Sequence, residues 1–332
     1  MKVRILFTAL IFFNGYCFAQ EPVKADTLIK QLDSLQQKQI DSGKATINTN
    51  PAAYNKKTTL GFKTYFILLG SNLKQQFTSP FHATKKDWLK VGAFAGTIAV
   101  LTLADKPVSK WVSNVTRDRQ GIITTSKYLT NISGTYETIT LSAIGGYAFI
   151  VNNQKLKTTT LLATQAYLTG AIVETALKFL SGRRRPNFYN ADGTNSNRFY
   201  GPFAKGHYDI QGNKINSSFP SGHATVAFAA ATVFAREYKD TKWVPIVSYS
   251  AASLIGLSRL TENKHWITDV LAGAVLGFLT GRQIVNNYHR YQLIQSGELK
   301  EKLLKNKRRN QIVFQMGNVQ GKMLPGIAYK FN

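Results

Sequence analysis

Apolar residues recur along most of the chain in segments whose spacing is that of α-helices. Between Thr158 and Phe179 the apolar positions have helical spacing, and no proline interrupts the segment. Comparable apolar segments occur at Val91–Ala104, Ile139–Val151, Leu161–Val173, His223–Ala235, Val244–Leu257 and Ile267–Ile284. Each of them predicts a helix, so the pattern indicates an all-α fold.

The lengths of these segments bear on the membrane question. Most are shorter than the roughly 20 apolar residues that a membrane span needs, and they carry many Gly, Ser and Thr residues. Such lengths favour helices that are buried in a protein core. We therefore expect an exported domain that faces the periplasm. An integral membrane bundle is the alternative, because several segments can be extended by mildly polar neighbours.

The N-terminus has the pattern of a secretory signal peptide. Met1–Arg4 is basic, Ile5–Phe13 is a short apolar run, and small residues precede Gln20, so we expect residues 1–19 to be removed. Residues 20–59 are polar, with one weak amphipathic helix, and Asn48–Lys57 resembles a linker. We expect this polar segment to act as a flexible spacer.

The C-terminal part of the chain differs from the rest. Lys300–Arg309 is strongly basic, which is typical of a solvated helix face, and Gln311–Asn332 alternates apolar and polar residues around glycine and proline. This alternation predicts two short strands that form a β-hairpin.

The net charge of the chain limits the classes of partner that it is expected to bind. Lys and Arg number 42 against 17 Asp and Glu, so the formal net charge is +25. Because export argues against nucleic acid as a partner, this charge favours an anionic membrane surface or anionic substrates. The one cysteine, Cys17, falls in the expected signal peptide, and the five histidines form no spaced metal-ligand set, so we expect no metal.

Three short motifs carry the candidate chemistry, and the first is K-x6-R-P. Lys178 and Arg185 are seven residues apart, so both point the same way if the segment is helical, with Pro186 ending the helix. Two cations on one face suit a phosphate, which Arg grips with its planar fork. Taken alone, the basic run Arg183–Arg185 is typical of a solvated helix end.

The second motif, Pro220-Ser221-Gly222-His223, is typical of a turn that opens a helix. Ser221 is the candidate N-cap, and Ala224–Arg236 contains no helix breaker. A helix N-terminus offers unpaired N–H groups to an anion, and Gly222 leaves the backbone accessible to it. His223 lies in the first turn and is expected to reach the same anion.

The third motif combines Ser258-Arg259 with His265 and Asp269. His265 and Asp269 are four residues apart, which makes them neighbours on one face of a helix. A carboxylate beside an imidazole fixes its tautomer, leaving the other ring nitrogen free to attack. Arg259 adds a third cation.

Together the three motifs resemble the signature of the type 2 phosphatidic acid phosphatase superfamily, which includes bacterial acid phosphatases and vanadium-dependent haloperoxidases. All eleven signature positions match, and the resemblance covers roughly Leu60–Tyr288. It implies a multi-helix bundle of the acid phosphatase and vanadium haloperoxidase type. The chain then divides into a signal peptide (1–19), a polar segment and linker (20–59), a phosphatase helical core (60–290) and a basic helix with a β-hairpin tail (291–332).

The resemblance also implies roles for individual residues. His265 would be the nucleophile that takes the phosphoryl group, Asp269 would orient it, and His223 would protonate the leaving oxygen. The phosphate would be bound by five residues: Lys178, Arg185, Ser221, Gly222 and Arg259.

These roles predict a metal-independent phosphatase that forms a phosphohistidine. Its substrate would be a lipid phosphate, such as phosphatidic acid, an isoprenoid diphosphate or lipid A, or a soluble phosphate ester. One alternative is a vanadium-dependent haloperoxidase, in which the same pocket holds vanadate as cofactor. Another is a non-enzymatic envelope protein that binds lipid. Residues 187–219, between the first two motifs, form either a lid or an ordinary connection.

Overall fold

A computed structural model of the chain describes residues 25–42, 47–132, 135–189, 195–203, 215–297, 311–319 and 322–330. Its helices are α1 (Ala25–Ser42), α2 (Phe62–Thr78), α3 (Lys85–Leu101), α4 (Asp105–Thr116), α5 (Gln120–Ile132), α6 (Thr135–Ile150), α7 (Gln154–Ser181), α8 (Gly222–Glu237), α9 (Trp243–Thr261) and α10 (Ile267–Gln295). Short 3-10 turns lie at Pro51–Ala53, Ser79–His82 and Thr102–Ala104. The prediction of a mostly helical fold is confirmed.

Two strands follow the helices. β1 (Gln311–Val319) and β2 (Lys322–Lys330) pair antiparallel, with Gln311 opposite Lys330 and Val319 opposite Lys322. The expected signal peptide at 1–19 and the basic run Lys300–Arg309 lie outside the described residues.

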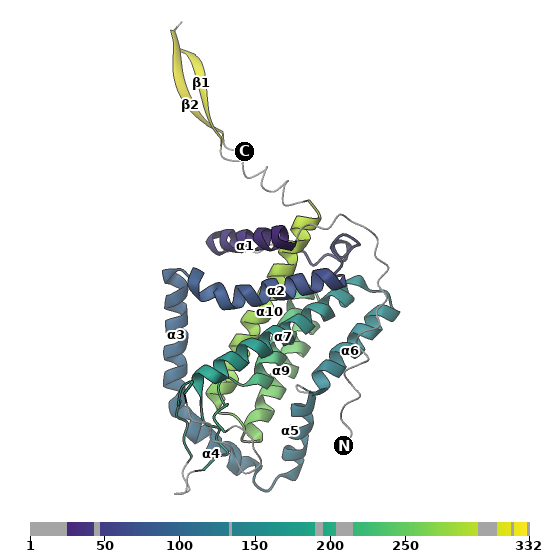
Figure 1. Cartoon of the computed structure of the whole chain (residues 1–332), viewed down its shortest axis with the longest axis vertical. Helices are drawn as coiled ribbons and strands as arrows, with labels where there is room; N and C mark the ends of the chain where they lie inside the picture. The colour runs from purple at the N-terminus through teal and green to yellow at the C-terminus, as the bar shows by residue number, and fades with distance from the viewer. Residues whose placement is uncertain are drawn as a thin grey trace.

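The bundle is organised around α8, which packs against α7, α9 and α10. α1 and α2 lie across one end of the bundle, and α4 lies at the other (Figure 1). The contact between α8 and α10 is unusually close. A Cβ atom on Gly273 of α10 would lie 2.5 Å from the carbonyl oxygen of Ser221, and one on Gly277 would overlap the carbonyl of Thr225. Glycine at these positions lets the two backbones touch, which places the N-terminal ends of α8 and α10 side by side.

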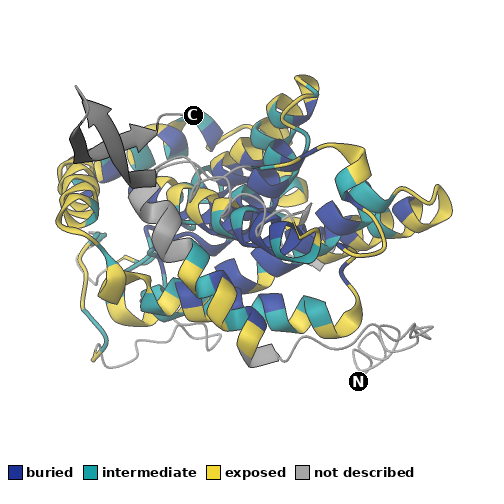
Figure 2. Cartoon of the chain, turned by 90° about the horizontal axis from the view of Figure 1, so that it is seen from above, coloured by how far each residue is buried: buried dark blue, intermediate teal, exposed yellow. Residues whose placement is uncertain are grey.

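The hydrophobic core joins the N-terminal segment to the bundle. Leu28 and Leu32 of α1 and Tyr54 of the following segment belong to the same buried cluster as Leu162 of α7 and Ile284 of α10. Buried residues fill the middle of the molecule when it is viewed from above (Figure 2). The expectation of a flexible spacer is therefore wrong for the described part of residues 20–59, because its apolar side chains are needed to cover the ends of α7 and α10.

The outer face of the bundle carries many large apolar side chains. Phe62 on α2 is 84% exposed, Leu103 between α3 and α4 is 79% exposed, and Ile150 on α6 is 85% exposed. The continuous stretch Lys85–Thr116 is long and apolar enough to cross a membrane. The expectation that the apolar segments are wholly buried core helices is thus wrong for their outward faces.

Candidate active site

The three motifs meet at the end of the bundle where α4 lies. α7 and α9 end there, whereas α8 and α10 begin there. His223 lies within electrostatic range of Arg259, His265, Lys178 and Arg185. The structure therefore brings residues of all three motifs together.

The first motif reaches the site differently from the prediction. α7 ends at Ser181, because Gly182 adopts the left-handed conformation (φ 54°) as its C-cap. Arg183 then pairs with Phe199 in an isolated β-bridge. Arg185 is therefore on an extended segment and not on the face of the helix that carries Lys178. Its Nη2 donates to Ser217 Oγ at 3.2 Å, and its buried Nε has no hydrogen-bond partner among the described residues.

The second motif starts α8, as predicted, but without the expected side-chain cap. Ser221 occupies the N-cap position, yet its buried hydroxyl has no partner in the described part of the chain. A Cβ on Gly222 would lie 3.1 Å from Lys178 Nζ and 2.5 Å from Glu174 Oε1. The absent side chain thus makes room for the Lys178–Glu174 ion pair (3.1 Å). A buried hydroxyl without a partner is a group that a bound anion would satisfy.

The third motif also departs from a simple helical pair. α10 begins at Ile267, so His265 precedes the helix, and Asp269 Oδ2 instead accepts a hydrogen bond from the Trp266 N–H at 2.8 Å. His265 Nδ1 lies 3.7 Å from Asp269 Oδ2 but only 2.8 Å from the carbonyl oxygen of Ser218. A carbonyl oxygen only accepts, so Nδ1 carries the proton and Nε2 keeps its lone pair.

Arg183 is the main site residue that the sequence analysis missed. Although it belongs to a run that resembled a solvated helix end, its side chain is fully buried and forms ion pairs with both Asp105 and Asp269. It also stacks on Phe199, with its guanidinium carbon 4.5 Å from the ring centroid. A signal was present, because Asp105 is a lone carboxylate at the end of an apolar segment and such a group needs a buried cation.

Two carboxylates temper the positive charge of the site. Glu174 pairs with Lys178, and Glu262 pairs with Arg259 at 2.7 Å. Glu262 is held in turn by a hydrogen bond from Thr130 of α5. These partners fix the direction of two flexible cations before any ligand binds.

The two histidines are both neutral at pH 7. Burial, followed by the charges of Arg259 and its neighbours, lowers the pKa of His223 to about 3. Burial also lowers the pKa of His265 to about 4, although Asp269 opposes this shift. Burial alone would raise the pKa of Asp269, but His265 and Arg183 hold it below its usual value, so the carboxylate stays ionised.

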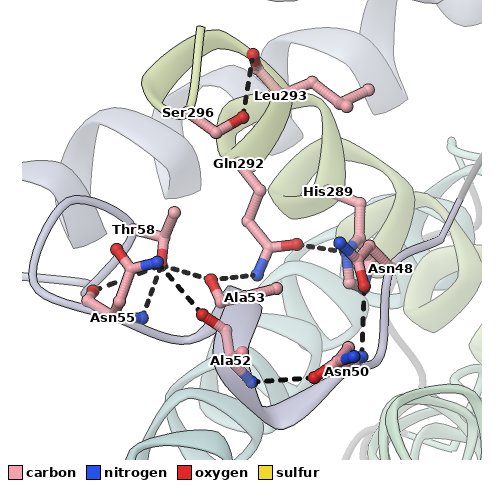
Figure 3. A pocket seen from close by; sticks show the side chains of 10 residues that line it. All are labelled: Asn48, Asn50, Ala52, Ala53, Asn55, Thr58, His289, Gln292, Leu293 and Ser296. Atoms are coloured by element: carbon pink, nitrogen blue, oxygen red, sulfur yellow. Dashed lines mark hydrogen bonds between the residues drawn. The ribbon is translucent and has the colours of Figure 1, made fainter. Parts of the chain in front are cut away.

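A separate pocket of about 270 Å³ lies near the other end of α10 (Figure 3). Its polar groups mostly bind one another. His289 Nδ1 contacts Gln292 Oε1 at 2.6 Å, and its Nε2 contacts Glu237 Oε1 at 3.0 Å. His289 is roughly 33 Å along the helix axis from the start of α10, so this pocket is not part of the candidate active site.

The helical bundle thus gathers cationic and histidine side chains of all three motifs at the ends of its helices. Residues 159–292 match the family model of the PAP2 superfamily. The matched residues extend from the first turns of α7 to the last turns of α10, and they include all eleven residues of the three motifs.

Parts of the chain also match individual relatives. The chain is 43% identical over 82 residues to a lipid A 1-phosphatase of Porphyromonas gingivalis, covering 24% of this chain and 18% of that protein. It is 32% identical over 150 residues to lipid phosphate phosphatase 1 of Arabidopsis thaliana, covering 37% and 43%. The chain thus spans less than half the length of either relative.

Solved structures were also similar. The transmembrane PAP2-type phosphatidylglycerolphosphate phosphatase of Bacillus subtilis is 20% identical with a TM-score of 0.40, covering 63% of this chain and 93% of that one. LpxE of Aquifex aeolicus is 21% identical with a TM-score of 0.38, covering 52% and 91%.

Proposed function

We propose that this protein is a metal-independent phosphatase that hydrolyses phosphate esters through a phosphohistidine at His265. The observation that carries this proposal is the hydrogen bond from His265 Nδ1 to the Ser218 carbonyl, which leaves Nε2 as a nucleophile beside a cluster of cations. An imidazole that is neutral and held in one tautomer is ready to attack phosphorus.

The reaction has two steps. His265 Nε2 attacks phosphorus, the bond to the ester oxygen breaks, and His223 gives that oxygen a proton. Water then attacks the phosphohistidine, His223 takes a proton from it, and phosphate leaves. The charge of the transition state is stabilised by Lys178, Arg185, Arg259, the Ser221 hydroxyl and the N–H of Gly222.

The substrate is a phosphorylated lipid, with soluble phosphate esters as weaker substrates. Two observations support this choice: the relatives are named as a lipid A phosphatase and a lipid phosphate phosphatase, and large apolar side chains cover the outer face of the bundle. The protein is associated with a membrane, since the stretch Lys85–Thr116 is long and apolar enough to contain a span, and the net charge of +25 favours an anionic lipid surface. Export by a signal peptide and a periplasmic site belong to the same proposal.

Phosphate release decides this function. The purified protein is incubated in EDTA with phosphatidic acid, an isoprenoid diphosphate, lipid A and p-nitrophenyl phosphate, with His265→Ala as the matched control. We expect turnover of at least one lipid by the wild type and none by the variant. Turnover that needs added Mg²⁺ would contradict metal independence, and bromide oxidation with vanadate and peroxide would instead identify a haloperoxidase.

A further inference from the structure

We propose that Arg183 and Asp105 are positioning residues, which act through Asp269 and Ser218 on the imidazole of His265. This inference rests on the proposed function, because it assigns roles in the same reaction. Neither residue is one of the specified positions of the three motifs, although Arg183 lies within the K-x6-R-P span.

The first observation is a row of alternating charges that is closed to solvent. Asp105 at the start of α4, Arg183 after α7 and Asp269 in the first turn of α10 are all fully buried, and Arg183 pairs with both carboxylates. Thr268 joins the row, since its Oγ1 accepts from Arg183 Nη1 at 2.7 Å and donates to Asp105 Oδ1 at 2.9 Å. Three elements far apart in sequence are therefore locked together next to His265.

The second observation is that Ser218 connects this row to the imidazole. The Ser218 N–H donates to the Arg183 carbonyl at 2.9 Å, and its hydroxyl donates to Asp269. Its carbonyl oxygen accepts a hydrogen bond from the Nδ1–H of His265 at 2.8 Å. Arg183 thus contacts both groups that hold His265. Its main-chain carbonyl binds Ser218, and its side chain binds Asp269.

The charges give the row a function beyond packing. Asp105, Arg183 and Asp269 together carry a net charge of −1. This net charge, and not that of Asp269 alone, acts on the imidazole of His265. Among the described residues, the other groups whose charges act on His265 include Lys178 from α7, Arg185 from the following segment and His223 from α8. Because those groups oppose a proton on His265, the row sets how far the imidazole can still accept one.

Single and double substitutions separate this role from a purely structural one. Asp105→Asn leaves a net charge of zero on the row and should move the acid limb of kcat/KM to lower pH by about one unit. Arg183→Gln leaves −2 and should move the limb to higher pH by about the same amount. The double variant restores the net charge of −1, so its acid limb should return close to that of the wild type. Arg183→Lys keeps the charge, so it should leave the acid limb in place while lowering kcat.

The titration of His265 is read a second time without turnover, by NMR of protein labelled with ¹⁵N-histidine and assigned with His265→Gln. The same opposed shifts and the same return in the double variant are expected there. The inference would be overturned if the acid limb moved in the same direction in both single variants. It would also be overturned if the limb of the double variant lay farther from that of the wild type than the limb of either single variant. If the wild type has no phosphatase activity, the proposed function fails, while the NMR titration still decides the role of the row. If Arg183→Gln does not fold, Asp105→Asn and the double variant give the answer.

Discussion

At the scale of single residues, the two histidines present a contradiction that the chemistry resolves. His223 is assigned to give a proton to the leaving group, yet its pKa of about 3 means that it carries none at neutral pH. Burial and four neighbouring cationic or titratable groups cause that depression. A tetrahedral dianion bound among the same groups would cancel their charge, so its arrival should raise the pKa of His223 and load it with a proton.

This argument predicts that anion binding takes up protons. Sulfate is a suitable probe because it does not titrate itself, and calorimetry at about pH 5, between the depressed and the ordinary pKa of histidine, should give a binding enthalpy that varies with the ionisation enthalpy of the buffer. The sign is uptake, since the bound state has the higher pKa. His223→Gln should take up fewer protons, and equal enthalpies in all buffers would contradict the argument.

The same assignment predicts a dependence on the leaving group. An aryl phosphate leaves without much protonation, whereas a lipid phosphate does not. His223→Ala should therefore lower kcat/KM for lipid phosphate by about 10²–10⁴-fold and affect p-nitrophenyl phosphate far less. His265→Ala should abolish both activities. Equal losses on the two substrates in His223→Ala would mean that His223 binds phosphate and is not the acid.

At the scale of elements, the apolar pattern predicted the helices well but not their ends. The segments around α3, α6, α7, α8, α9 and α10 were recognised because a buried stripe leaves a local periodicity. The stop of α7 at Gly182 was not, since it depends on the carbonyl of Gly201 lying where a Cβ would be. The burial of Arg183 likewise depends on Asp105, which is 78 residues away. Local patterns carry no record of such distant partners.

The closeness of α8 and α10 yields a prediction at this scale. Gly273→Ala would force a methyl group against the Ser221 carbonyl, so we expect the free energy of unfolding to fall by about 1–3 kcal/mol. Phosphatase activity should fall as well, because the candidate site lies at the N-terminal ends of both helices. Gly96→Ala on α3 is the matched control, since nothing lies within 4 Å of it. That variant should be neutral or slightly stabilised. Thermal unfolding by circular dichroism compares the two, and equal stability would refute close packing as the reason for Gly273.

At the scale of the whole molecule, the outer face and the charge point to a lipid environment. Exposed apolar side chains occur on α2, α3, α6, α7, α9 and α10, which is far more than water would favour. We expect the protein to stay in the membrane pellet after alkaline carbonate washing and to be released by detergent. Release by carbonate alone would show a peripheral protein held by its charge.

The contacts of Asp269 indicate which residues of such a site would be lost first if its activity were no longer under selection. Its carboxylate accepts a hydrogen bond from the Trp266 N–H at the start of α10 and pairs with buried Arg183, so it serves the fold as well as the proposed chemistry. His265, in contrast, is held by others and holds little itself. In a descendant that no longer needs activity, selection would release His265 first and keep Asp269, because its loss would leave a buried arginine without one of its partners. A pseudoenzyme of this lineage should therefore be recognisable by a missing histidine beside an intact aspartate.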